Sequence, residues 1–87
     1  MFEVKVTRRA RKTSARIPEH EKRRVAEFLS ILRENPVPSK SYDLKKLKGY
    51  KETFRARIGD IRIIYEILWN QRKINVLVIK SREKAYT

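Results

Sequence analysis

The fold is decided by the stretch Phe54-Arg55-Ala56-Arg57-Ile58-Gly59-Asp60-Ile61-Arg62-Ile63-Ile64-Tyr65. Apolar and polar residues alternate on both sides of Gly59-Asp60, which predicts a β-hairpin with a two-residue type II′ turn. The turn sets three cross-strand pairs: Ile58 with Ile61, Arg57 with Arg62, and Arg55 with Ile64. One face of the hairpin is then apolar, and the three arginines share the other face.

The pairing of Arg57 with Arg62 places two positive charges directly opposite each other, which is destabilising in a sheet. Two interpretations account for it. The guanidinium groups could hold an anion between them, and a phosphate suits that geometry. They could also splay apart on a solvated face. The charge of the whole chain favours the phosphate.

The composition limits the classes of function. The 87 residues suffice for one domain, 1–87, with a modest core, and the net charge of +13 favours RNA, DNA or an acidic protein as partner. No apolar run is long enough to span a membrane, and the alternating N-terminus is unlike a signal peptide. We therefore expect a cytoplasmic protein that does not act at a membrane. Without cysteine and with one histidine, the chain has no thiolate nucleophile, and we expect no metal site and no cofactor.

The remaining patterns predict an α+β fold with the order β-α-α-β-β-β. Alternation predicts a strand over 2–7. Helices are expected over 8–17 and from Pro18 to Asn35-Pro36, and residues 36–41 form a loop. Residues 43–49 hold Leu44 and Leu47 among lysines, which are expected to form a solvated loop face. Strands follow at 53–58, 61–69 and 74–80. The helix pair should cover one face of an antiparallel sheet. The expected core comprises Val4, Val25, Phe28, Leu29, Leu32, Phe54, Ile58, Ile63 and Tyr65, and Trp69 is expected to pack into it.

With these elements placed, the chain resembles the RelE/ParE toxin superfamily, and within it the archaeal RelE-like toxins. The resemblance rests on the element order, the Lys46-Leu47-Lys48-Gly49 element, the hairpin 55–65, and the tail Arg82-Glu83-Lys84-Ala85-Tyr86. It implies the toxin of a type II toxin–antitoxin system. Such a toxin enters the ribosomal A site and cleaves mRNA there, as a metal-independent endoribonuclease, and an antitoxin protein neutralises it.

The resemblance also implies which residues act on RNA. Arg55 and Arg57 match the two basic residues of the strand before the turn, and Arg62 matches the phosphate-binding arginine after it. Arg82 and Tyr86 match the arginine and tyrosine of the last motif. We therefore predict Arg57, Arg62, Arg82 and Tyr86 as catalytic. RNA-binding roles are predicted for Arg55, Lys45, Lys46, Lys48, Lys80 and Lys84.

The sequence departs from the best-known bacterial pattern at Arg55 and Arg57, where lysines are common. A lysine with a lowered pKa can accept a proton, whereas arginine stays protonated. The general base for the attacking 2′-hydroxyl is therefore open. Tyr86 could serve if neighbouring cations lower its pKa. Catalysis could otherwise rest on orientation and electrostatic stabilisation.

Other readings of the same sequence stay open. The protein could instead inhibit DNA gyrase, as ParE-type toxins do, or be a non-catalytic basic RNA-binding module. The basic segment 8–16 could contact ribosomal RNA or the antitoxin. An acidic antitoxin could cover the arginine face directly, or bind the helix side and make the toxin too bulky for the A site. The larger surface offered by residues 8–34 favours the helix side.

Overall fold

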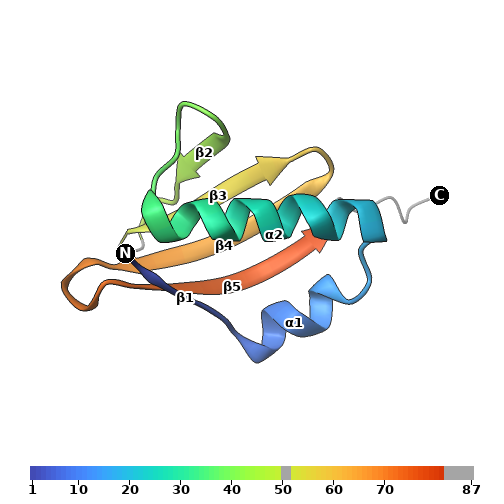
Figure 1. Ribbon diagram of the computed structural model, residues 1–87, viewed down its shortest axis with the longest axis horizontal. Coiled ribbons are helices and arrows are strands. Elements are labelled where there is room, and N and C mark those ends of the chain that lie inside the picture. The colour runs from blue at the N-terminus through green and yellow to red at the C-terminus, as the bar shows by residue number, and fades with distance from the viewer. Residues whose placement is uncertain (50–51, 82–87) are drawn as a thin grey trace.

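The computed structural model describes residues 1–49 and 52–81, and Figure 1 shows their arrangement. Eight elements follow one another along the chain: β1 (Glu3–Val6), α1 (Arg8–Ser14), α2 (Glu19–Glu34), β2 (Asp43–Lys46), β3 (Thr53–Ile58), β4 (Ile61–Leu68), the 3₁₀ turn η1 (Trp69–Gln71) and β5 (Lys73–Ser81). The α+β class and the predicted order of helices and strands are confirmed, with one strand more than the sequence indicates.

The additional strand is β2, which lies in the segment expected to be a loop. It is only four residues long and pairs antiparallel with β3 at the edge of the sheet. Its one apolar residue, Leu44, stands among charged neighbours, so the alternation is too short to be recognised. Backbone pairing with β3 therefore defines this strand more than its own sequence does.

The five strands have the spatial order β1-β5-β4-β3-β2. β1 runs parallel to β5 and the other pairs are antiparallel, so the sheet is mixed and not antiparallel throughout. The two helices carry the chain away after β1, and β1 pairs with the last strand. The direction of a pair between the two ends of the chain is not encoded in either strand alone.

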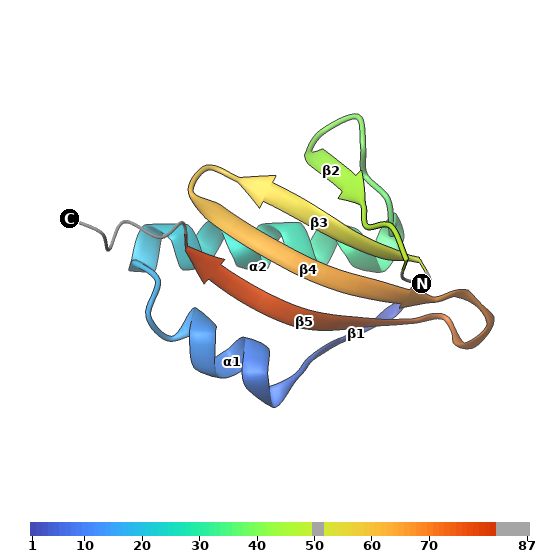
Figure 2. The ribbon, with the colours of Figure 1, turned by 180° about the vertical axis from the view of Figure 1, so that it is seen from behind.

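Of the two helices, only α2 covers a face of the sheet, so the expectation that both helices cover it holds for α2 alone (Figure 1). α2 crosses one face, and α1 lies beside β5 (Figure 1). Seven of the predicted core residues are buried, and Val4 and Leu29 are half-buried against them. The core also takes in residues that the sequence analysis did not assign to it: Ala10, Ile17, Ala56, Ile61, Ile67, Ile74, Val76 and Ile79. Seen from behind, α2 lies beyond the strands and leaves the facing side of β3, β4 and β5 open (Figure 2).

Local interactions explain where the first helix begins and ends. Thr7 caps α1 by accepting a hydrogen bond from the Ala10 amide at 3.2 Å. The helix ends at Ser14, earlier than the predicted residue 17. Near its end, Thr13 and Ser14 donate their hydroxyl groups to carbonyls of the preceding turn. Such side-chain bonds compete with the helical backbone and favour an early end.

The prediction that Trp69 packs into the core is wrong. The strand alternation ends at Leu68, and Trp69 begins the 3₁₀ turn with 46% of its surface exposed. Its ring packs edge to face with that of Phe2, with ring centroids 5.6 Å apart, and its indole N–H donates to Glu52 Oε1 at 3.1 Å. Trp69 therefore joins the end of the sheet to the Glu52 side chain.

Candidate functional site

The hairpin of β3 and β4 has the register that the sequence predicts. Arg57 lies opposite Arg62, Arg55 opposite Ile64, and Ile58 opposite Ile61. Gly59 has a φ of +60°, whereas φ is not positive at Asp60. This combination fits a type II′ turn and excludes type I′, which needs positive φ at both central residues. The glycine therefore fixes the register that brings the two arginines together.

A row of charged residues crosses the open face at this end of the sheet. Asp43 of β2 pairs with Arg57, Arg57 with Arg62, and Arg62 with Lys80 of β5. Directly opposed residues point to the same side of a sheet. Neighbouring strands lie about 4.8 Å apart, so three cations follow one another over about 10 Å of backbone.

A second row lies beside the first. Lys45 of β2 pairs with Arg55, and Arg55 pairs with Ile64. The Arg55 Nε atom is buried and has no hydrogen-bond partner within residues 1–49 and 52–81. Five predicted site residues therefore share one face: Lys45, Arg55, Arg57, Arg62 and Lys80. We call this set the arginine face.

The arginine face is hollowed where β3 turns into β4. The hollow has a volume of about 430 Å³ and is lined by Asp43, Arg57, Gly59, Asp60, Ile61 and Arg62. Two guanidinium groups there can each present paired N–H donors to a phosphate. An anion in the hollow would lie between the two guanidinium groups, with the carboxylates of Asp43 and Asp60 also in the lining.

Asp43 and Asp60 line this hollow although the sequence analysis did not assign either to the site, and only Asp43 comes from outside the hairpin. Although Asp43 pairs with Arg57 across β2 and β3, no ion pair within 4 Å joins the two side chains. A carboxylate at the rim of a cationic site can accept a proton, which arginine cannot. The signal in the sequence is weak, because only the pairing of β2 brings residue 43 to the hairpin.

Other predicted site residues are not brought to this face. Lys46 pairs with Phe54 and so belongs to the opposite side of the sheet, where its Nζ lies 3.1 Å from Glu52 Oε2. Hydrogen bonds from Trp69 and from Lys46 lower the pKa of Glu52. Lys48 is exposed in the turn after β2, and Arg82, Lys84 and Tyr86 lie outside the described residues.

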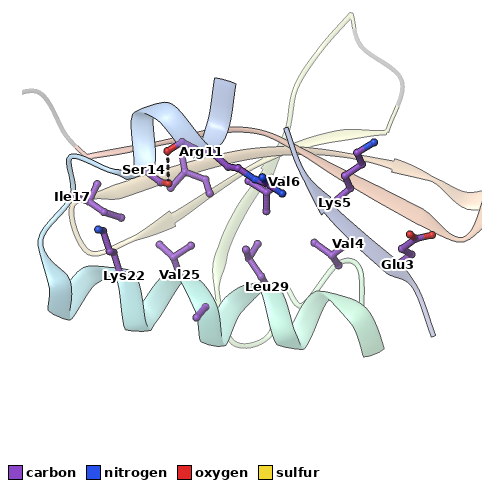
Figure 3. Close-up of a pocket in the computed structure, with 12 residues that line it drawn as sticks. Glu3, Val4, Lys5, Val6, Arg11, Ser14, Ile17, Lys22, Val25 and Leu29 are labelled. Carbon is purple, nitrogen blue, oxygen red and sulfur yellow. Dashed lines mark hydrogen bonds between the residues drawn. The ribbon is translucent and has the colours of Figure 1, made fainter. Parts of the chain in front are cut away.

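A larger groove of about 610 Å³ lies on the helix side, between β1, α1 and α2 (Figure 3). Val4 and Val6 of β1 face Val25 and Leu29 of α2 across it (Figure 3). Ile17 and Ile79 add to its apolar lining. Its cations are Lys5, Arg11 and Lys22, against one carboxylate, Glu3. The groove therefore combines an apolar floor with a mostly positive rim.

The described residues hold neither a membrane-spanning helix nor a cluster of metal ligands. Neither helix is long and apolar enough to cross a membrane. Within residues 1–49 and 52–81, no three histidine or carboxylate side chains gather as ligands for a metal ion.

Comparison with known proteins relates this architecture to toxins. The family model described as "ParE toxin of type II toxin-antitoxin system, parDE" matches residues 4–86. A protein of Methanocaldococcus jannaschii named "Putative toxin RelE1" is 36% identical over 85 residues, which is 98% of this chain and 94% of that protein.

Solved structures agree with this relationship. A chain of the archaeal RelE–RelB complex from Pyrococcus horikoshii OT3 superposes with a TM-score of 0.84 at 36% identity, covering 97% of this chain and 98% of the other. A chain of the intact Escherichia coli RelBE toxin–antitoxin complex superposes with a TM-score of 0.79. The match covers 97% of this chain and 100% of that one, and at 15% identity it supports the fold alone.

Proposed function

Because the chain belongs to the ParE toxin family of type II toxin–antitoxin systems, we propose that this RelE-type toxin stops translation by cleaving mRNA on the ribosome. Its ribosomal target places its action in the cytoplasm. The proposed reaction is attack of a 2′-hydroxyl on the adjacent phosphate, without a metal ion or other cofactor. Arg57 and Arg62 bind and stabilise that phosphate. Arg82 and Tyr86 keep the catalytic roles implied by the family motif.

The observation that carries the proposal is the placement of Arg57 directly opposite Arg62 in one hollow. An anion that lies between the two guanidinium groups offsets their repulsion, so binding it lowers the free energy of the folded protein. Negative charge grows on the phosphate as the 2′-oxygen attacks. Donors already oriented toward that charge stabilise the transition state more than the bound RNA, which is what accelerates the reaction.

The proton of the 2′-hydroxyl needs an acceptor, and the hollow offers Asp43 for that role. Its carboxylate lines the same hollow as Arg57 and Arg62. We assign Asp43 as the general base of this toxin, with Tyr86 as the competing assignment from the family motif. Asp43→Asn keeps the size of the side chain and removes the basic oxygen. We expect this variant to lose at least 100-fold in cleavage rate while Tm stays unchanged.

The ribosome supplies what the open site lacks. Over the described residues the arginine face lies on the side of the sheet away from α2, and we infer that free RNA can bind there in many registers. Holding mRNA in one orientation removes much of the entropic barrier to reaction. We therefore expect efficient cleavage on the ribosome and slow cleavage of free RNA.

Primer extension on mRNA in a translation extract tests the proposed function. The protein should produce new mRNA ends only when ribosomes are present, and Arg62→Ala should remove them. The matched control is Arg23→Ala, which removes an exposed cation from α2. Intact mRNA together with loss of DNA gyrase supercoiling activity would show the gyrase alternative to be correct. Intact mRNA with gyrase unaffected would leave only an RNA-binding role.

The groove on the helix side is the proposed antitoxin site. Its apolar floor and positive rim match an amphipathic segment with acidic flanks. The outer edge of β1, an edge strand, adjoins it. Because the groove and the arginine face lie on different sides of the sheet, an antitoxin in the groove neutralises the toxin by making it too large for the A site.

The antitoxin site is tested with a variant that fills the groove without disturbing the core. Ala26 is an exposed residue of α2 that lines the groove, so Ala26→Arg should weaken antitoxin binding at least 100-fold and keep the fold. Ser30→Arg, also exposed on α2, is the control. Arg62→Ala should keep normal antitoxin affinity. A loss of more than about 2 kcal/mol there would make Arg62 a hot spot and place the antitoxin on the arginine face.

A further inference from the structure

A second positive hollow lies between α1 and the end of β5. It has a volume of about 480 Å³ and is lined by Lys12, Thr13, Arg16, Lys80 and Ser81. Lys12 lies in the last turn of α1, and Arg16 follows that helix. α1 lies against β5 because the shorter strand β1 ends where the helix begins (Figure 2). The packing of α1 therefore brings cations from two distant parts of the sequence into one hollow.

Among the described residues, the cations of this hollow have no acidic partner. Lys12, Arg16 and Lys80 are all exposed. Within residues 1–49 and 52–81, no carboxylate lies within 4 Å of any of their charged groups. The hollow at the hairpin contains two aspartates beside its two arginines, whereas among residues 1–49 and 52–81 no acidic residue lines this one. Its field is thus uniformly positive, which favours an anion with several charges.

Lys80 connects the two hollows. It lines the second hollow and is also the direct cross-strand partner of Arg62 in β4. A strand of RNA whose phosphate lies between Arg57 and Arg62 therefore reaches Lys80 one strand further along the sheet, about 4.8 Å away at the backbone. From there it continues toward Lys12 and Arg16. Lys80 thus places a cation between the hairpin hollow and the second hollow.

We propose that Lys12, Arg16 and Lys80 form a second phosphate-binding subsite, which holds the mRNA strand beside the nucleotide that is cleaved. The subsite binds backbone phosphates and reads no base, because its groups are cations without a shaped pocket for a base. It orients the strand, so the scissile phosphate meets Arg57 and Arg62 in one register. This inference rests on the proposed RNA-cleaving function and adds a role for α1.

The test measures binding of RNA that cannot be cleaved. Two dye-labelled 2′-O-methyl oligonucleotides are used, a trinucleotide that fills only the hairpin hollow and an octanucleotide that spans both hollows. Each neutralised cation lowers the salt slope of single-strand binding by about 0.7. The double variant Lys12→Gln/Arg16→Gln should therefore lower the slope for the octanucleotide by about 1.4. This corresponds to a loss of about 25-fold in affinity at 0.1 M salt.

Two matched variants make the outcomes distinct. Arg23→Gln/Arg33→Gln removes two exposed cations from α2, and we expect a loss below threefold. The Lys12→Gln/Arg16→Gln protein should bind the trinucleotide with the same affinity as the unmodified protein. The proposal is overturned if the α2 variant loses as much affinity for the octanucleotide, or if Lys12→Gln/Arg16→Gln loses as much affinity for the trinucleotide as for the octanucleotide. Either result would mean that these cations attract RNA only through the general charge of the protein.

The same measurement separates failure of the subsite from failure of the proposed function. Arg57→Gln/Arg62→Gln should weaken binding of both oligonucleotides. If it does so while Lys12→Gln/Arg16→Gln weakens neither, the subsite is wrong and the RNA site at the hairpin stands. If Arg57→Gln/Arg62→Gln weakens binding of neither oligonucleotide, there is no RNA site at the hairpin, and the proposed subsite beside it is wrong as well.

Discussion

Arg62→Ala separates function from stability because the interaction it removes is repulsive in the free protein. Arg57 and Arg62 are direct cross-strand partners. Two unit charges about 7 Å apart in water repel by about 0.6 kcal/mol, and like-charged cross-strand pairs cost roughly 0.2–1 kcal/mol. Arg62 is half-buried, so losing its stem offsets part of the gain. We expect the free energy of unfolding to stay equal or rise, by less than about 1 kcal/mol.

The assay is a double-mutant cycle on thermal unfolding with Arg57→Ala, at 0.1 M and at 1 M salt. A stabilisation of about 0.5 kcal/mol should raise Tm by roughly 2–4 °C in a domain of this size. The coupling should vanish at 1 M salt, where the screening length is about 3 Å. Cleavage on the ribosome should fall by about 10²–10³, the usual effect of removing one donor to a developing charge.

Two results would refute this reasoning. Destabilisation by more than about 1 kcal/mol would mean that the Arg62 side chain stabilises the fold and that its repulsion with Arg57 is not the dominant effect. Full translational arrest by the Arg62→Ala protein would mean that the pair does not bind the scissile phosphate.

Three further predictions concern the scaffold. Gly59→Ala should destabilise by about 1–2 kcal/mol because φ is +60° there, and denaturant unfolding would show it. Tyr65→Phe should cost about 1–3 kcal/mol in the same experiment, since the buried hydroxyl donates to the Pro36 carbonyl at 2.7 Å. The Trp69 hydrogen bond, with that of Lys46, lowers the pKa of Glu52 from its ordinary value. The hydrogen bond between Trp69 and Glu52 therefore stabilises the fold while Glu52 is ionised and is lost as the pH falls through the lowered pKa. Trp69 fluorescence should change in a step over that acid range, and Glu52→Gln should abolish the step.

Some features of the site could be predicted from the sequence because they are local. A two-residue turn with glycine first determines which residues pair, so the pairing of Arg57 with Arg62 follows from one short stretch. The helix α2 likewise follows from apolar spacing and from Pro18 at its start. In both cases the residues that define the element are neighbours along the chain.

Other features of the site could not be predicted, because they depend on partners far apart in the sequence. Asp43 and Lys45 reach the arginine face only because β2 pairs with β3, and the adjacent Lys46 faces the other way for the same reason. A shift of one residue in that pairing would bring Lys46 to the arginine face and turn Asp43 and Lys45 to the opposite face. The sequence alone cannot decide between such registers in a short, polar edge strand.

The charge of +13, the α+β class and the hairpin with its paired arginines follow from composition or from neighbouring residues, so they can be predicted without the fold. Tertiary structure alone decided that β1 runs parallel to β5 and that α1 lies beside Lys80. It also decided that the apolar groove opens on the helix side, away from the arginines. These contacts join distant segments, and they form where the whole core buries the most apolar surface, which no single segment specifies.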